Sequence, residues 1–257
     1  MKILPLAFLI LSSLAKASNE TIVYLQDDEI GYLGDLTAEA NRKVFEIYDQ
    51  SEPKPKWLSI RSNGGNVDYG MALGEWIFAR GLGVRVFEYC FSSCANYVFT
   101  AASKRVVSNF AVIGYHGGSQ STQFKFVWPS SFDSMPREAQ QAFKGKWKVD
   151  ILKAAKRERA FFERIHVNPR IVLLGQYPEV KGALAIESPT DIDCWTYSVR
   201  GFQLLGVDEI QVVNGPWAPR LLSGDNVSIE ISDALVGANL GTPISEELQV
   251  PDGLLSR

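Results

Sequence analysis

Short apolar runs alternate with segments of helical spacing along most of the chain. Runs rich in β-branched and aromatic residues predict strands over 21–25, 57–60, 84–89, 106–107, 111–115, 195–197 and 210–213. Apolar positions three and four apart predict helices over 36–48, 69–80, 93–102, 136–165 and 199–205. Strands that alternate with helices favour an α/β fold with mostly parallel strands.

Helix boundaries are marked by residues with a known role at helix ends. Thr37 is a candidate N-cap, Gly81 should stop the second helix, and Pro136 stands at the start of the long one. That long helix is amphipathic and charged, and it should end before Asn168-Pro169, with His166 as a helix-end residue.

Two regions lack this regular pattern. Residues 117–134 are rich in Ser, Gln and aromatic side chains and are typical of a loop or lid. After Asn214 the composition shifts to Pro, Gly, Ser and Asp, which predicts an irregular tail or an oligomer arm over 214–257. The expected organisation is therefore a leader over 1–17, one domain over 18–213, and this tail.

The first residues resemble a cleaved secretory signal. A basic Met1-Lys2 precedes an apolar run over 3–14, and Ala15-Lys16-Ala17 is a small-x-small cleavage site. The apolar run is too short to span a bilayer, although an uncleaved anchor is the alternative, and no later segment is long enough. We therefore expect a periplasmic or secreted protein.

Composition and charge narrow the chemistry. The net charge of −3 does not favour nucleic acid, and the basic run over 144–159 is interleaved with apolar residues, as on the wet face of a helix. Two histidines and three cysteines, without a paired C-x-x-C, do not make a zinc or iron–sulfur site. We expect no metal and no organic cofactor.

Three separated segments carry residues suited to acyl chemistry. Ser62-Asn63-Gly64-Gly65 follows a strand, and its glycines can direct backbone N–H groups toward a ligand oxygen. Ser93, in the segment 90–96, stands between a strand and an apolar helix, and His116 leaves an apolar strand between glycines. Each has a simpler interpretation when it is taken alone, namely a structural turn, an N-cap serine and a satisfied histidine.

The order and spacing of these segments resemble the proteolytic subunit of Clp protease and its wider Clp/crotonase-like superfamily. That family has Ser-Pro-Gly-Gly and Gly-Met where this chain has 62–65 and Gly70-Met71, and its nucleophilic serine leads into a Thr-Ala segment, as Ser93 leads into Thr100-Ala101. The resemblance covers about 21–213. Asn63 in place of proline, a shortened Gly-Ala context before the serine and the flanking cysteines depart from the family pattern.

The resemblance implies superhelical ββα repeats and a Ser-His-Asp triad of Ser93, His116 and Asp193. Asp193 is selected by the later Gly206-Val207-Asp208 turn, and Asp191 is a close competitor because it is two residues away in an extended segment. The N–H groups of Gly65 and Cys94 would form the oxyanion hole. The chain would then be an exported, ATP-independent serine peptidase or related hydrolase that acts on peptide or protein substrates.

The cysteines leave alternatives open. In an oxidising compartment we expect a disulfide, with Cys90–Cys94 ahead of a bridge to Cys194. Cys94 is also a rival nucleophile, and Lys104 is the nearest candidate for a Ser–Lys dyad of the kind found in the related signal peptide peptidases.

Other functions and partners follow from the same resemblance. A non-catalytic binding or assembly module on this scaffold is the main alternative, and acyl-CoA chemistry of the crotonase kind is another. Family members form rings, so self-association as a homo-oligomer is expected through the long helix. No ATPase partner is expected, because an exported protein meets no ATP.

Overall fold

The computed structural model describes residues 20–121, 129–187, 194–219, 222–223 and 226–241. The leader over 1–17, Asp191 and Asp193 lie outside the described residues. Among the residues that are described, no helix is both long enough and apolar enough to cross a membrane.

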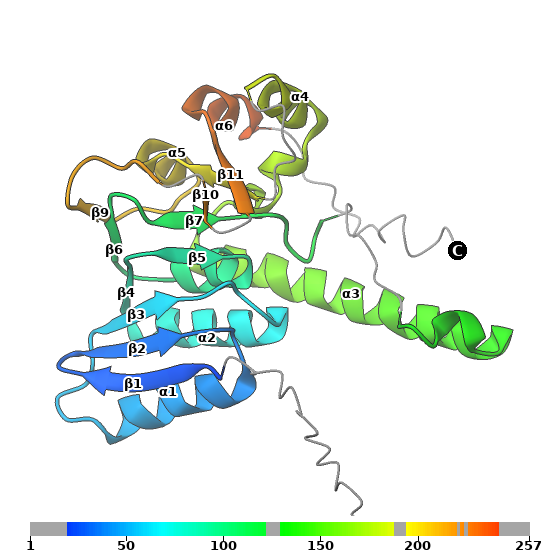
Figure 1. Cartoon of the computed structure of the whole chain (residues 1–257), viewed down its shortest axis with the longest axis horizontal. Helices are drawn as coiled ribbons and strands as arrows, with labels where there is room; N and C mark the ends of the chain where they lie inside the picture. The colour runs from blue at the N-terminus through cyan, green and yellow to red at the C-terminus, as the bar shows by residue number, and fades with distance from the viewer. Residues whose placement is uncertain (1–19, 122–128, 188–193, 220–221, 224–225, 242–257) are drawn as a thin grey trace, which may run out of the picture.

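A six-stranded sheet forms the centre of the molecule (Figure 1). Its strands, in spatial order, are β1 (Ile22–Gln26), β2 (Glu29–Leu33), β3 (Trp57–Arg61), β4 (Gly83–Val86), β6 (Arg105–Ser108) and β9 (Ile210–Val213). Only the pairing of β1 with β2 is antiparallel, and the other four pairings are parallel. The prediction of an α/β fold with mostly parallel strands is therefore confirmed.

Two smaller sheets stand beside the central one. In the first, β5 (Tyr89–Phe91) pairs in parallel with β7 (Val112–Gly114). In the second, β8 (Cys194–Tyr197) pairs in parallel with β11 (Asn226–Ile231), which also pairs with β10 (Leu222–Ser223). An antiparallel bridge between Tyr115 and Trp195 joins the end of β7 to β8.

Helices connect and cover these sheets. They are α1 (Ala38–Gln50), α2 (Val67–Arg80), the π-helix η1 (Cys94–Phe99), α3 (Arg137–Ile165), α4 (Pro178–Glu187), α5 (Val199–Leu204) and α6 (Asp233–Asn239), with 3₁₀ turns η2 (Phe132–Ser134), η3 (Pro169–Val172) and η4 (Leu174–Gln176). The side chain of Thr37 accepts a hydrogen bond from the N–H of Ala40, as its predicted capping role requires. Gly81 and His166 end α2 and α3 in the left-handed conformation, with φ of 62° and 58°.

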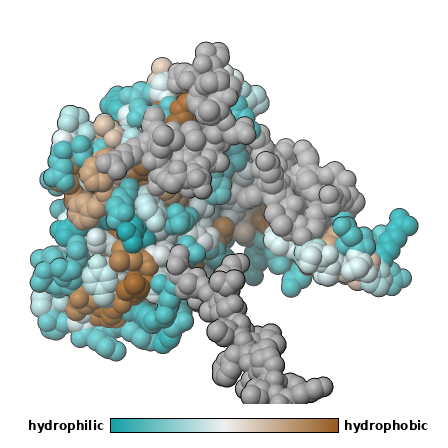
Figure 2. All heavy atoms as spheres, viewed as in Figure 1, coloured by the Kyte–Doolittle hydropathy of each residue, from teal (hydrophilic) through white to brown (hydrophobic). Residues whose placement is uncertain are grey.

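Helix α3 is anchored at one end only. Its last three turns bury Ala155, Glu158, Phe161 and Phe162, whereas its first half projects from the body (Figure 1). Figure 2 shows that the projecting part carries mostly hydrophilic or intermediate side chains. The anchored end therefore belongs to the core, where it packs against α2 and η1.

Close packing joins α2, η1 and α3. A methyl group added at Gly74 would lie 2.4 Å from the backbone oxygen of Tyr97 and 3.1 Å from the ring of Phe161, so only glycine fits there. The rings of Tyr97 and Phe161 meet edge to face at 5.5 Å. This contact sets the position of η1, the helix that follows Ser93.

Several predicted boundaries need correction. The predicted strand over 84–89 is two strands, β4 and β5, which belong to different sheets. The tail predicted as irregular over 214–257 contains β10, β11 and α6 within its described part. In β11, Ile229 and Ile231 point inward and are almost fully buried, and Ser232 caps α6. The polar composition of this region therefore conceals the alternating pattern of a strand and the cap of a helix.

Candidate active site

Three turns meet at the carboxyl ends of neighbouring strands. The turn over 62–65 follows β3, Ser92 follows β5, and His116 lies two residues beyond β7. Strands β5 and β7 are paired, and a parallel bridge between Ser62 and Cys90 places the β3 turn beside them. In α/β proteins, ligands bind beyond the carboxyl ends of parallel strands.

Ser92 and His116 are hydrogen-bonded to each other. Nε2 of His116 lies 2.7 Å from Oγ of Ser92. Ser92 is half-buried and has a φ of +56°, which is uncommon for a residue with a side chain. It stands between a strand and a helix, and a strained serine at such a turn presents its hydroxyl outward.

The serine that is hydrogen-bonded to His116 is Ser92, whereas Ser93 bonds elsewhere. Ser93, which the family resemblance indicated as the nucleophile, is 2% exposed, and its Oγ donates a hydrogen bond to the backbone oxygen of Gly65 at 3.0 Å. A methyl group added at Gly70 would lie 2.9 Å from Cβ of Ser93. Because β5 ends at Phe91, Ser92 is the first residue of the turn and faces His116, while Ser93 points inward against α2.

His116 has the properties of a base. Its side chain is exposed, yet partial desolvation lowers the pKa of its imidazole below the ordinary 6.5. The imidazole is therefore neutral near pH 7. A neutral imidazole can accept a proton from the serine hydroxyl 2.7 Å away.

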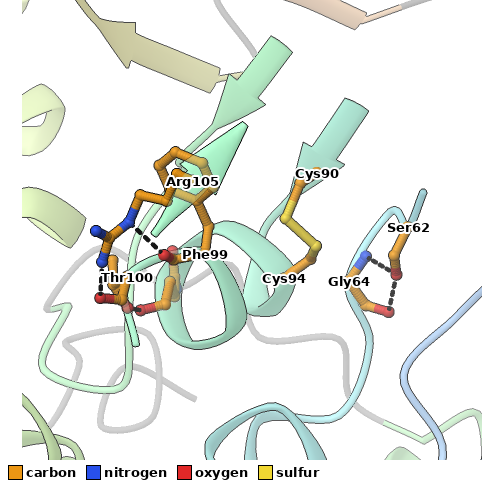
Figure 3. Close-up of a disulfide and its surroundings, with 8 residues drawn as sticks. Ser62, Gly64, Cys90, Cys94, Phe99, Thr100 and Arg105 are labelled. Carbon is orange, nitrogen blue, oxygen red and sulfur yellow. Dashed lines mark hydrogen bonds between the residues drawn. A yellow bond between two sulfur atoms is a disulfide. The ribbon is translucent and has the colours of Figure 1, made fainter. Parts of the chain in front are cut away.

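The glycine turn lies directly against Ser92. Gly64 and Gly65 have φ of 97° and 144°, and a methyl group at Gly64 would lie 2.8 Å from Cβ of Ser92. The N–H of Gly64 donates to Oγ of Ser62 at 3.0 Å (Figure 3). By contrast, the N–H groups of Gly65 and Ser93 donate no hydrogen bond to any of the described residues.

A disulfide joins Cys90 to Cys94, with a Cα–Cα distance of 5.3 Å (Figure 3). This confirms the predicted pairing, and Cys194 is buried outside it. The bridge spans Ser92, because one cysteine is in β5 and the other begins η1. A sulfur held in a disulfide has no thiol, so Cys94 is not the nucleophile while the bridge is intact.

Arg105 fixes the far end of η1. Its guanidinium is buried and donates to the backbone oxygens of Phe99 at 2.9 Å and Thr100 at 2.6 Å (Figure 3). These bonds satisfy carbonyls that the end of a helix leaves without partners. The helix after Ser92 is thus held by the disulfide at one end and by Arg105 at the other.

The remaining candidates are two aspartates and a lysine. Asp191 and Asp193 are outside the described residues, although Trp195 exchanges two 2.8 Å backbone hydrogen bonds with Tyr115, the neighbour of His116. Lys104 precedes β6, at the amino end of a parallel strand, whereas the site is at carboxyl ends. Lys104 is therefore poorly placed for a Ser–Lys dyad.

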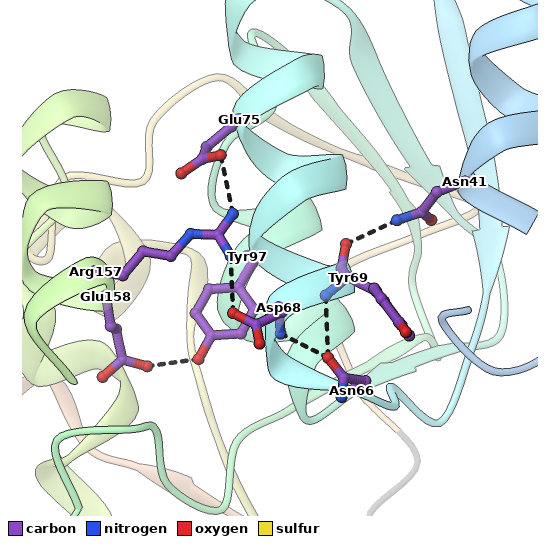
Figure 4. A network of polar contacts seen from close by, with 8 residues as sticks. All are labelled: Asn41, Asn66, Asp68, Tyr69, Glu75, Tyr97, Arg157 and Glu158. Carbon is purple, nitrogen blue, oxygen red and sulfur yellow. Dashed lines mark hydrogen bonds and ion pairs between the residues drawn. The ribbon is translucent and has the colours of Figure 1, made fainter. Parts of the chain in front are cut away.

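An open groove of about 730 Å³ runs between the start of α2 and the middle of α3. Asn66, next to Gly65, and Ser119, three residues after His116, line the end nearest the site, and Trp147 and Ile151 supply apolar surface. Arg157 of α3 forms ion pairs with two carboxylates of α2, Asp68 at 2.8 Å and Glu75 at 3.1 Å (Figure 4).

In the described part of the chain, no three His, Cys, Asp or Glu side chains are grouped so that they could hold a metal ion. A comparison with protein-family models finds no match, and a comparison with curated proteins finds none either. The functional conclusion therefore depends on the geometry of the site.

Proposed function

We propose that the protein is an exported serine hydrolase, and that it acts as an ATP-independent peptidase with Ser92 as nucleophile and His116 as general base. The observation that carries this proposal is the 2.7 Å hydrogen bond between Nε2 of His116 and Oγ of Ser92. The left-handed backbone at Ser92 and its position between β5 and η1 support the same role.

The reaction uses atoms that the site already brings together. With its proton on Nδ1, His116 accepts the hydroxyl proton of Ser92 at Nε2 while Oγ forms a bond to the substrate carbonyl carbon. The imidazolium then returns that proton to the leaving amine as the amide bond breaks. Water, activated by the same imidazole, cleaves the acyl-serine and restores the hydroxyl.

The N–H groups of Gly65 and Ser93 are proposed as the oxyanion hole. Both lie on the turns that flank Ser92, and neither is engaged with a described residue. In a site where Ser92 is the nucleophile, Ser93 takes the place that the sequence prediction gave to Cys94, because the donor is the residue after the nucleophile. One such donor is worth about 2.7–4 kcal/mol of transition-state stabilisation.

The chain path supports a Clp/crotonase-like architecture. Strands β4 and β6 lie in the central sheet, and each is followed by a strand of the small sheet, β5 or β7, and then by a helix. This repeated ββα order is what the family resemblance implies. We extend the family resemblance to the third member of the triad and propose that Asp193 orients His116, with Asp191 as its competitor. Both aspartates precede β8 in the chain, and β8 is bridged to the end of β7.

Export is proposed from the leader pattern over 1–17 together with the disulfide, since disulfides persist in oxidising compartments. A peptide or protein substrate fits the open groove beside the site, which has apolar surface and charged walls. Self-association and the lack of an ATPase partner remain expectations from the resemblance.

Covalent labelling tests this function. We expect a fluorophosphonate probe to attach to Ser92, as located by peptide mass mapping, and we expect the purified protein to hydrolyse unfolded polypeptide without ATP. If the folded protein is never labelled, or if the label maps outside the segment 90–96, the proposal is contradicted and a binding or assembly module is favoured.

The pH dependence of labelling gives a second test. The rate should rise with pH as His116 loses its proton and should level off above a midpoint below 6.5, because desolvation lowers the pKa of His116. His166→Asn, at the end of α3, is the matched control and should leave this profile unchanged. A rate that stays flat from pH 8 down to the lowest pH at which the protein remains folded would remove His116 from the mechanism.

A further inference from the structure

A buried carboxylate stands behind the candidate site. Glu158 belongs to the anchored end of α3, and its side chain is 0% exposed. Burial raises the pKa of its carboxyl group, while the hydrogen bonds it accepts act in the opposite direction. A fully buried acid requires partners, and its partners here come from the two segments that carry the reacting groups.

The first set of partners is the loop after His116. The N–H of Ser119 donates to Oε1 of Glu158 at 2.9 Å, and the N–H of Gln120 donates to Oε2 at 2.9 Å. A methyl group added at Gly118 would lie 2.5 Å from Oε1, so the loop backbone passes directly over the carboxylate.

The second partner is on the helix after Ser92. The hydroxyl of Tyr97, in η1, donates to Oε1 of Glu158 at 2.6 Å (Figure 4). Tyr97 is fully buried, and its pKa is raised by burial and by Glu158, so the phenol keeps the proton that it donates. One carboxylate therefore joins η1 to the loop after His116.

Two further side chains hold the same loop. Nδ2 of Asn96 donates to the backbone oxygen of Gly117 at 2.8 Å, and Nε2 of Gln176 donates to that of His116 at 3.1 Å. Both of these side chains are neutral amides. Glu158 receives four hydrogen bonds from two segments and is the only carboxyl group of this set.

We propose that Glu158 is a positioning residue that keeps the imidazole of His116 within hydrogen-bonding distance of Ser92. This inference depends on the proposed function for its catalytic consequence. The physical reason is that the loop after His116 is outside any helix or strand, so its place relative to η1 depends on side-chain contacts, and Glu158 makes the largest number of hydrogen bonds among them. A displacement of about 1 Å between reacting groups can cost about 100-fold in rate.

Glu158→Gln is the decisive substitution. Glutamine keeps the size of the side chain but has one acceptor oxygen, so its NH₂ group would face an N–H or O–H donor. We expect the fluorophosphonate labelling rate to fall by about 10-fold or more, with little change in KM for a hydrolysed peptide. Glu163→Gln is the matched control, because Glu163 is exposed on the same helix, and its rate should not change.

Tyr97→Phe gives a second, milder variant in case Glu158→Gln does not fold. It keeps the ring that packs against Phe161 and removes only the hydroxyl. We expect a smaller fall in labelling in the same direction. Folded variants that label at the wild-type rate would overturn the proposal.

Nitrogen NMR of the imidazoles tests positioning without any catalysis. The chain has two histidines, so His116→Asn assigns both sets of signals. In the wild-type background, Ser92→Ala should move the Nε2 signal of His116, because it removes the hydrogen bond. In the Glu158→Gln background this response should shrink or vanish, and in the Glu163→Gln background it should persist.

The two proposals fail in different ways. If the wild-type protein never labels, the hydrolase function is wrong, and the NMR response still decides whether Glu158 positions His116. If the protein labels but the response to Ser92→Ala is as large in Glu158→Gln as in wild type, the positioning role is wrong and the hydrolase function stands.

Discussion

Ser92→Ala should abolish fluorophosphonate labelling and reduce peptide hydrolysis by about 10⁴-fold or more, whereas Ser93→Ala should retain both. Among the described residues, Ser92 provides the only hydroxyl hydrogen-bonded to the imidazole of His116, with Oγ at 2.7 Å from Nε2. Without that oxygen, no acyl-enzyme can form. The hydroxyl of Ser93 instead donates to the backbone oxygen of Gly65 and is directed away from His116.

The neighbouring variant should affect stability rather than chemistry. Ser93→Ala removes a buried hydrogen bond, which we expect to lower the free energy of unfolding by about 1 kcal/mol. Denaturant unfolding of both variants provides the check, because Ser92→Ala should unfold close to wild type. A label that maps to Ser93, or a Ser92→Ala protein that still labels, would return the assignment to Ser93.

The one-residue difference between the two assignments has a local cause. Sequence shows two adjacent serines between a strand and a helix, and the family register selects the second. The deciding fact is where β5 ends, since successive residues of an extended segment point to opposite sides. Because β5 ends at Phe91 and Ser92 turns through a positive φ, the first serine faces His116.

Elements with strong local signals were predictable. The cap at Thr37, the stop at Gly81 and the long helix that ends at His166 are all as expected, because each depends on residues within a few positions. Strand β2 was not predicted, although Ile30 and Tyr32 are fully buried, because its alternation is short and lies beside two aspartates. Its place in the sheet depends on β3, which is distant in sequence.

Glu158 shows what sequence reasoning missed in the site. The charged residues over 144–159 were interpreted as one wet helix face. Glu158, however, is three residues after Ala155 and four before Phe162, both buried, so it is on the apolar stripe of α3. A charge on the buried side of a helix indicates a polar partner inside the protein, and that spacing could have identified it.

Reduction of the Cys90–Cys94 disulfide should destabilise the protein and slow labelling of Ser92. The bridge closes a short loop, with a sequence separation of 4, so the entropic contribution to the free energy of unfolding is about 2 kcal/mol. For a domain of this size, that corresponds to a fall of about 4–8 °C in Tm. Labelling should slow because the bridge fixes the turn in which Ser92 holds a positive φ.

The measurement compares thermal unfolding and labelling rate with and without a reductant. A Cys90→Ala/Cys94→Ala double variant is the control, because reductant should have no further effect on either quantity when the bridge is absent. Cys194→Ala should keep its sensitivity to reductant, since Cys194 lies outside the bridge. If reduction of the wild-type protein leaves both Tm and labelling rate unchanged, the disulfide does not support the candidate site, and Ser92 must be held by the packing of η1 alone.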